Sequence, residues 1–294
     1  MIRKIIGRNL KQYFRDKTSV FFSLLAVFIV IVLYILFLAQ VQIDSVLESA
    51  EGAISNDKIA YLINSWILAG LLSITTVTST LGAFGTMVGD YEKHKIMDFK
   101  SSPLKQMDYP IANILSSFIV GSIISLLSFA VYGSYIVIST GYMYPIESVL
   151  NGIGIILLSA LMSAALMGFI VSNLKTNSAF SSVSLVIGTI IGFLNGLYVP
   201  IGSLPDAVQT VVKCLPFGHI ASLLRQAIVT DAIDVSFEGM PQSVVDEYIS
   251  GFGVVMSWGD KKIDIHTSLI FIISVMLISL ILFFVNHNRK KKEI

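Results

Sequence analysis

The chain has 294 residues, of which 54% are hydrophobic and only 13% carry a charge. This composition excludes an ordinary soluble domain, in which about a quarter of the residues are charged, and favours a membrane protein. Cys214 is the only cysteine. The chain therefore cannot form an internal disulfide framework or a cysteine-rich metal cluster, and we expect Cys214 to fill space as a small apolar side chain.

Six stretches without Asp, Glu, Lys or Arg are each long enough to cross a hydrocarbon core of about 30 Å, which takes about 20 apolar residues. These stretches are 18–43, 59–89, 109–146, 148–174, 176–205 and 267–286. The pattern predicts an all-α integral membrane protein with six transmembrane helices. An N-terminal interfacial helix and a re-entrant helical hairpin before the last span complete the predicted fold.

The net charge of +1 conceals an asymmetry between the segments that join the spans. Segments 1–17, 90–108 and 289–294 and the turn at Lys175 hold 15 of the 20 Lys and Arg, but only 6 of the 19 Asp and Glu. Cytosolic loops of membrane proteins carry an excess of Lys and Arg. We therefore expect a multi-pass protein of a bacterial plasma membrane with both termini in the cytosol.

Residues 1–17 combine apolar side chains at helical spacing with basic side chains that lie largely elsewhere on the helix. The apolar residues are Ile2, Ile5, Ile6, Leu10, Tyr13 and Phe14. This pattern predicts a cytosolic amphipathic helix along the anionic inner leaflet, and a helical topology signal is the simpler alternative. The apolar run that follows is too long for a secretion signal, so we expect it to stay as the first span.

The region between the fifth and sixth stretches is too apolar for a free loop, yet prolines and glycines interrupt it. Proline disrupts a spanning helix unless neighbouring groups satisfy the freed carbonyls. We expect two short helices, at about 205–214 and 217–230, that dip into the outer half of the bilayer. The predicted divisions are a five-span unit at 18–230 with this hairpin at 198–230, an extracellular segment at 231–266, a sixth span at 267–288 and a basic cytosolic tail at 289–294.

Motifs for several kinds of chemistry are absent from the sequence. It contains no phosphate-binding loop, zinc-protease motif or nucleophile elbow, so we expect neither an enzyme nor a nucleotide site, cofactor or metal on this chain. We expect no nucleic-acid partner. Ion-driven transporters place charged residues within their spans, and none of the six stretches contains one. This absence argues against ion-coupled transport, although backbone carbonyls can also bind ions.

The second and fifth stretches are instead rich in hydroxyl side chains. One interpretation is a mildly polar wall along the path of an amphipathic substrate. The alternative is close helix packing, in which small hydroxyl residues let backbones approach. The predicted substrate-path residues are Thr76, Ser79, Thr80, Phe84, Ser182 and Asn195.

The loop after the second stretch carries the most specific motif, YEKHKIMDFKSSPLK. A charged turn with a glutamate leads into a short helix, which is followed by Ser-Pro-Leu and a basic residue. A second motif precedes the sixth stretch and consists of several spaced prolines followed by an arginine. The residues of these two motifs are Glu92, Ser102, Pro103, Leu104 and Lys105, then Pro200, Leu204, Pro205, Pro216 and Arg225.

In this order along a six-span chain, these motifs resemble the type-2 permeases of ABC exporters, the transmembrane subunits of those ABC transporters. The Gly-Thr usually found after the charged turn is replaced here by Lys95-Ile96. The resemblance implies that two permeases, identical or paralogous, pair around a central path among membrane lipids. Each docks on a separate cytosolic ABC ATPase, which binds the ATP and Mg.

The resemblance further implies that the loop at 89–110 couples the permease to the ATPase, whereas a solvated topogenic turn is the alternative. The implied coupling residues are Asp90, Tyr91, Glu92, Lys93, His94, Lys95, Ile96, Met97, Asp98 and Phe99. The implied function is export of a hydrophobic or amphipathic compound, peptide or lipid-linked molecule. The alternative function is a non-transport assembly factor or sensor that binds a partner through its extracellular segment.

Overall fold

A computed structural model of the chain describes residues 2–17, 20–21, 32, 55–101, 104–105, 107–259 and 261–290. Within these residues the chain is almost entirely helical, with one two-stranded antiparallel hairpin. Most of the predicted first span, most of the loop that follows it, and the motif residues Ser102 and Pro103 lie outside the described residues.

Among the described residues, five helical stretches are long and apolar enough to cross a membrane. They are α4 (Asn56–Ala83) continued by α5 (Gly85–Glu92), α7 (Asp108–Thr140), α8 (Ile146–Val171), α9 (Asn177–Leu194) and α13 (Ile265–Lys290). Their positions match the second to sixth predicted stretches. The predicted class, a helical integral membrane protein, is confirmed.

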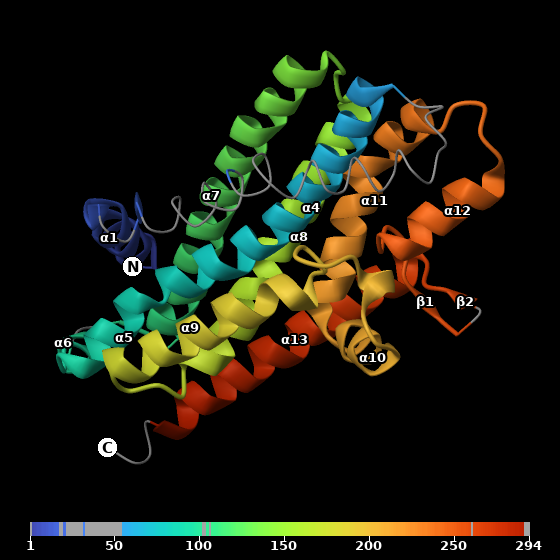
Figure 1. Cartoon of the computed structure of the whole chain (residues 1–294). Helices are drawn as coiled ribbons and strands as arrows, with labels where there is room; N and C mark the ends of the chain where they lie inside the picture. Colours follow the sequence, from blue (N-terminus) through green and yellow to red (C-terminus); the bar gives the residue numbers. More distant parts are fainter. Residues whose placement is uncertain are drawn as a thin grey trace.

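Helix α4 is the central element of the fold (Figure 1). It packs against α7, α8, α9 and α11 (Pro216–Ser236), and most of its side chains are buried, including its serines and all of its threonines except Thr78. A helix with this many hydroxyl groups is better placed among other helices than against lipid. The stretch from the start of α4 to the end of α5 has 37 residues, which corresponds to about 55 Å of helix and exceeds the hydrocarbon core.

Helix α9 ends at Leu194, well before the end of the uncharged stretch 176–205. Gly196 adopts a left-handed φ of +62°. The N–H groups of Gly196 and Leu197 both donate to carbonyls of the last turn of α9, each at 3.0 Å. This pattern is a Schellman cap, which closes a helix irrespective of how apolar the following residues are.

Two further helices follow, at the positions predicted for a hairpin. A 3₁₀ turn (Ile201–Ser203) leads to α10 (Asp206–Cys214), and Pro216 then opens α11 in the first turn, where its missing N–H is tolerated. The axes of α10 and α11 differ by 88°. Helix α11 runs to Ser236, beyond the predicted end near 230, because no breaker intervenes.

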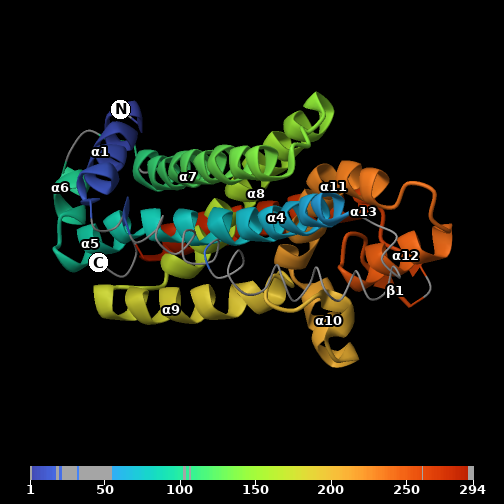
Figure 2. The same cartoon turned by 45° about the horizontal axis from the view of Figure 1, so that its top comes forward.

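The remaining elements gather at opposite ends of the long helices (Figure 2). At one end, here named the loop end, lie α1 (Ile2–Arg15), α5 and α6 (Ile96–Ser101). At the other, the hairpin end, lie α12 (Gln242–Gly251) and the strands β1 (Ser257–Trp258) and β2 (Lys261–Lys262). The α4–α5 helix connects the two ends.

Candidate functional site

Helix α1 packs its apolar face against the protein. Ile5, Asn9 and Tyr13 lie four positions apart, so they share one face of the helix, and all three are buried. The amide of Asn9 donates to Asn113 Oδ1 at 3.1 Å and to Ser116 Oγ at 3.3 Å, both on α7. These hydrogen bonds fix the rotation of α1 about its axis and attach it to the start of α7.

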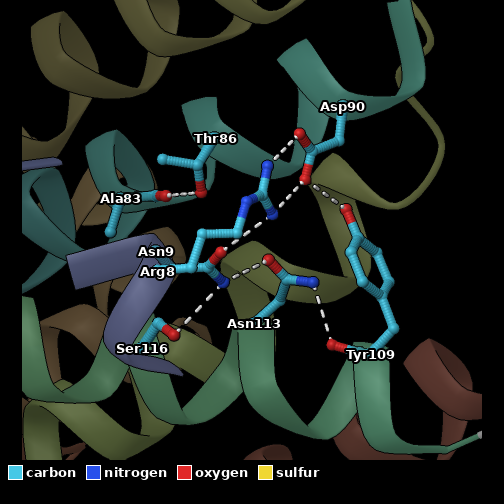
Figure 3. Close-up of polar contacts among 8 residues, drawn as sticks. All are labelled: Arg8, Asn9, Ala83, Thr86, Asp90, Tyr109, Asn113 and Ser116. Carbon is cyan, nitrogen blue, oxygen red and sulfur yellow. Dashed lines mark hydrogen bonds and ion pairs between the residues drawn. The ribbon is translucent and has the colours of Figure 1, made fainter. Parts of the chain in front are cut away.

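Arg8 extends from α1 to Asp90, near the end of α5 (Figure 3). Its Nη1 donates to Asp90 Oδ2 at 2.7 Å, and its Nη2 donates to Oδ1. The hydroxyl of Tyr109 donates to the same carboxylate at 3.1 Å. The Asp90 side chain is only 2% exposed, so the carboxylate depends on these donors in place of water. The hydrogen bond to Asp90 raises the pKa of Arg8, which favours the charged guanidinium.

Helix α6 is held against this ion pair by its apolar side chains. The ring of Phe99 lies 5.1 Å from the Arg8 guanidinium carbon and 5.0 Å from the ring of Tyr109. Ile96 is 8% exposed and belongs to the main apolar core. Met97, by contrast, is 45% exposed. Of the three apolar residues in this short helix, Met97 is the one that a partner protein can reach.

Glu92, at the end of α5, caps helix α9. Its Oε1 accepts the backbone N–H of Asn177 at 3.0 Å, and its Oε2 accepts the side-chain amide of the same residue. Thr176 supplies a second cap, since its hydroxyl accepts the N–H of Ala179 at 3.3 Å. A carboxylate is stabilising at a helix N-terminus, where unpaired N–H groups concentrate positive charge. Glu92 therefore connects the loop to α9.

A tight turn at residues 93–95 joins α5 to α6, and His94 has a φ of +55° there. The left-handed conformation costs a residue with a side chain about 1–2 kcal/mol, although histidine tolerates it better than most. The exposed loop surface, as we define it here, consists of Lys93, His94, Lys95, Met97 and Asp98.

The ten predicted coupling residues thus fall into separate groups. Asp90, Tyr91, Ile96 and Phe99 are wholly or partly buried, Glu92 caps α9, and the other five make up the exposed loop surface. The partners of Asp90 were missed by sequence reasoning. An acid directly after an apolar stretch signals that a partner is needed, but nothing in the sequence identifies Arg8 as that partner.

A comparison with models of protein families identifies the family of this chain. Residues 2–229 match the ABC-2 type transporter family. The chain belongs to this family. It is therefore a multi-pass transmembrane permease component of an ABC transporter and not the ATPase, and permeases of this family generally work with an ATPase subunit. A comparison with curated protein sequences finds no match. The matched region ends within α11, so α12, the β-hairpin and α13 lie beyond it.

The predicted substrate-path residues of the permease lie in different surroundings. Five of them are buried, whereas Ser182 is exposed on α9. Thr76 shares a hydrogen bond of 2.7 Å with Ser159 of α8, and the amide of Asn195 donates to Ser73 of α4. Contacts of this kind are expected from the packing alternative. The path itself stays a prediction.

Arg225, from the proline-punctuated motif, organises a second polar cluster toward the hairpin end. It is fully buried and donates to the carbonyls of Asn195 and Gly196 at 2.8 and 3.0 Å. Its guanidinium carbon lies 4.9 Å from the ring of Trp66, whose Nε1 donates to the carbonyl of Phe252 at 2.8 Å. One cation thus connects α11 to the end of α9, to α4 and to the turn after α12.

Proposed function

We propose that this permease exports a hydrophobic or amphipathic compound, peptide or lipid-linked molecule from the cell. A separate cytosolic ATPase docks at the loop end and supplies the energy by binding and hydrolysing ATP with Mg. A second permease, identical or paralogous, completes the pathway. Both termini face the cytosol of a bacterial cell, and the hairpin end faces outward.

The observation that carries this proposal is the continuity of α4 with α5. At the hairpin end the first turns of α4 are held by α11 and the turn that follows it, since Tyr61 donates to Asp231 at 2.8 Å and Lys58 lies 3.2 Å from Glu238. At the loop end the same helix carries Asp90 and Glu92. A displacement of the loop is therefore transmitted along one helix to the opposite end of the protein.

The contacts at the loop end determine which parts move together. Arg8 joins α1 to α5 through Asp90, and Glu92 joins α5 to α9 through Asn177. When the ATPase closes on ATP and pushes the exposed loop surface, α1, α5 and the start of α9 move with it. Switching between inward- and outward-facing states by rigid-body motion of helices is an established form of conformational change.

The uncharged stretches support the proposed substrate class. A charged substrate needs paired charges or a water-filled route through the bilayer, and the six stretches contain no Asp, Glu, Lys or Arg. Hydroxyl and apolar side chains suit a molecule that already partitions into the membrane. The low polarity also favours energy input from ATP over coupling to an ion gradient.

Co-purification tests the docking surface. Met97→Asp places a charge on the most exposed apolar residue of α6 and should release the ATPase from the tagged permease, because loss of a central contact costs about 2 kcal/mol or more. Lys95→Glu should weaken binding in the same way. Lys175→Glu is the matched control, since Lys175 is exposed in the α8–α9 turn and lies outside the exposed loop surface. Equal recovery of the ATPase with all three variants would contradict the proposal.

Vesicles of defined orientation test the direction of transport. Inside-out vesicles that contain the permease and its ATPase should accumulate an amphipathic substrate when ATP is added outside. Met97→Asp should abolish this uptake while the permease remains in the membrane. Uptake into right-side-out vesicles loaded with ATP would show import and contradict export.

A further inference from the structure

The β-hairpin between α12 and α13 lies beyond the region shared with the family. Its base is closed by the N–H of Ile263, which donates to the carbonyl of Met256 at 2.8 Å. Met256 is buried with Val212 of α10 in a small apolar cluster, against which Ile263 and Leu194 also pack. Leu194 is the last residue of α9, and α13 begins at residue 265, just after the hairpin. The base of the hairpin thus lies where two spanning helices end.

The two faces of the hairpin differ in their surroundings. Ser257 pairs with Lys262, and Trp258 pairs with Lys261. Lys262 Nζ lies 3.3 Å from the carboxylate of Asp246 on α12, so its face is turned toward that helix. Successive strand residues point to opposite faces, so Trp258 and Lys261 point away from α12. Trp258 is 54% exposed, and Lys261 is exposed beside it.

Chain geometry limits how far this pair can lie from the two helix ends. Two strand residues beyond Met256 correspond to about 7 Å, and the headgroup layer on each side of a bilayer is about 5–8 Å thick. An indole ring is favoured in this layer because it combines an apolar body with an N–H donor. A lysine in the same layer can keep its ammonium group next to lipid phosphates.

The charge of the surrounding segment makes this pair distinctive. The segment 231–266 is acidic, with Asp231, Asp234, Glu238, Asp246 and Glu247 among its side chains. Its only Lys or Arg residues are Lys261 and Lys262, both in the hairpin. An aromatic residue and a cation on the free face, next to two helix ends, fit a phospholipid headgroup.

We propose that Trp258 and Lys261 bind phospholipid headgroups at the hairpin end and thereby anchor the start of α13 at the membrane surface. In the proposed topology this surface is the outer leaflet. The anchor sets the depth of the hairpin and of α10, which is packed to it through Val212. This inference requires only that α9 and α13 span the membrane, so it is independent of the ATPase and of the transported substrate.

Tryptophan fluorescence of the full-length permease tests the anchor, because the chain has only two tryptophans. Trp66 is fully buried, so the difference between the spectra of the unmodified protein and of Trp258→Phe reports Trp258. The protein is reconstituted in vesicles of phosphatidylcholine and phosphatidylglycerol. The lipids carry bromine either near the ester end or near the methyl end of the acyl chains. We expect emission at shorter wavelength than in water, with the larger loss of signal from bromine near the ester end.

Two outcomes would overturn the proposal. If iodide in the aqueous phase quenches Trp258 and brominated lipid does not, the hairpin lies in water, where a soluble partner can reach it. Greater quenching by bromine near the methyl end would place the ring in the hydrocarbon core. Lys261→Gln should reduce quenching by the lipid, whereas Lys262→Gln makes the same charge change on the opposite face and should not. If both variants change the quenching equally, Lys261 does not bind the headgroup specifically.

Discussion

At the scale of single residues, the ion pair between Arg8 and Asp90 joins α1 to α5 in the proposed coupling. The carboxylate is buried, whereas the arginine side chain is 31% exposed. Removing the cation leaves a buried carboxylate that still accepts a hydrogen bond from the Tyr109 hydroxyl but has lost both donors of the guanidinium. A charged group left without its partner costs more than the intact pair contributes.

A double-mutant cycle measures this contact. Arg8→Gln should lower the free energy of unfolding by about 1–3 kcal/mol, because a buried carboxylate loses its main donor. Asp90→Asn should also destabilise the permease, but the double variant should cost less than the sum, with a coupling energy of about 0.5–3 kcal/mol. The measurement is the free energy of unfolding of the purified protein in detergent, taken from denaturant titrations of the four proteins. Arg3→Gln, on the exposed side of α1, is the control and should change little. Additive effects would show that the two side chains do not interact.

Residue contacts of this kind could not be predicted from the sequence. Arg8 and Asp90 are separated by 82 positions, and the pairing depends on which way α1 and α5 are rotated. The cap that Glu92 provides to α9 depends on the same unknown orientation. Arg225 was predicted as a motif residue, but its partners are backbone carbonyls, and every residue carries one.

At the scale of elements, the crossing of α4 and α7 shows how the hydroxyl-rich helix packs. Gly121 of α7 faces Thr80 of α4, and a Cβ built on the glycine would lie 2.3 Å from the Thr80 methyl group. The Thr80 hydroxyl donates to carbonyls within its own helix, and Ser117 donates to the Thr80 carbonyl. A glycine opposite a small hydroxyl residue permits the close helix approach typical of membrane proteins.

Substitutions at this crossing separate packing from a role in the substrate path. Gly121→Ala should destabilise the permease by about 1–3 kcal/mol, the usual cost of an added group in a packed interior. Adding Thr80→Ser removes the clashing methyl while keeping the hydroxyl, so the double variant should regain much of the stability and transport. Gly133→Ala is the control, because a Cβ at Gly133 of the same helix meets nothing within 4 Å. If Thr80→Ser alone changes which substrates are exported at unchanged stability, Thr80 belongs to the path.

The existence of the helices was predictable, whereas their ends were not. The five described spans were predicted correctly from hydropathy. An apolar segment in a bilayer must pair its own backbone N–H and C=O groups, and a helix does this within the segment. Hydropathy placed the end of α9 too late because the cap at Gly196 depends on backbone conformation. The prolines predicted the break between α10 and α11, but the 88° angle between them results from packing against neighbouring helices.

At the scale of the whole molecule, the two ends differ in charge and in construction. The loop end carries the basic helix α1, while the hairpin end carries α12 and most of the acidic segment 231–266. The excess of Lys and Arg predicts that the loop end is cytosolic. The Arg8–Asp90 pair then lies on the side where ATP is available, and the hairpin anchor lies on the opposite side.

Cysteine labelling on intact cells tests this orientation. Cys214 is exposed and is the chain's only cysteine, so Cys214→Ser provides a background without thiols. Glu247→Cys on α12 and Lys93→Cys next to α5 introduce single thiols at exposed positions of opposite ends. A membrane-impermeant maleimide should label position 247 on intact cells and should label position 93 only after the cells are opened. Because both side chains are exposed, a difference in labelling reports the side of the membrane and not burial within the protein. Labelling of position 93 but not of position 247 on intact cells would reverse the topology and, with it, the proposed side of ATPase docking.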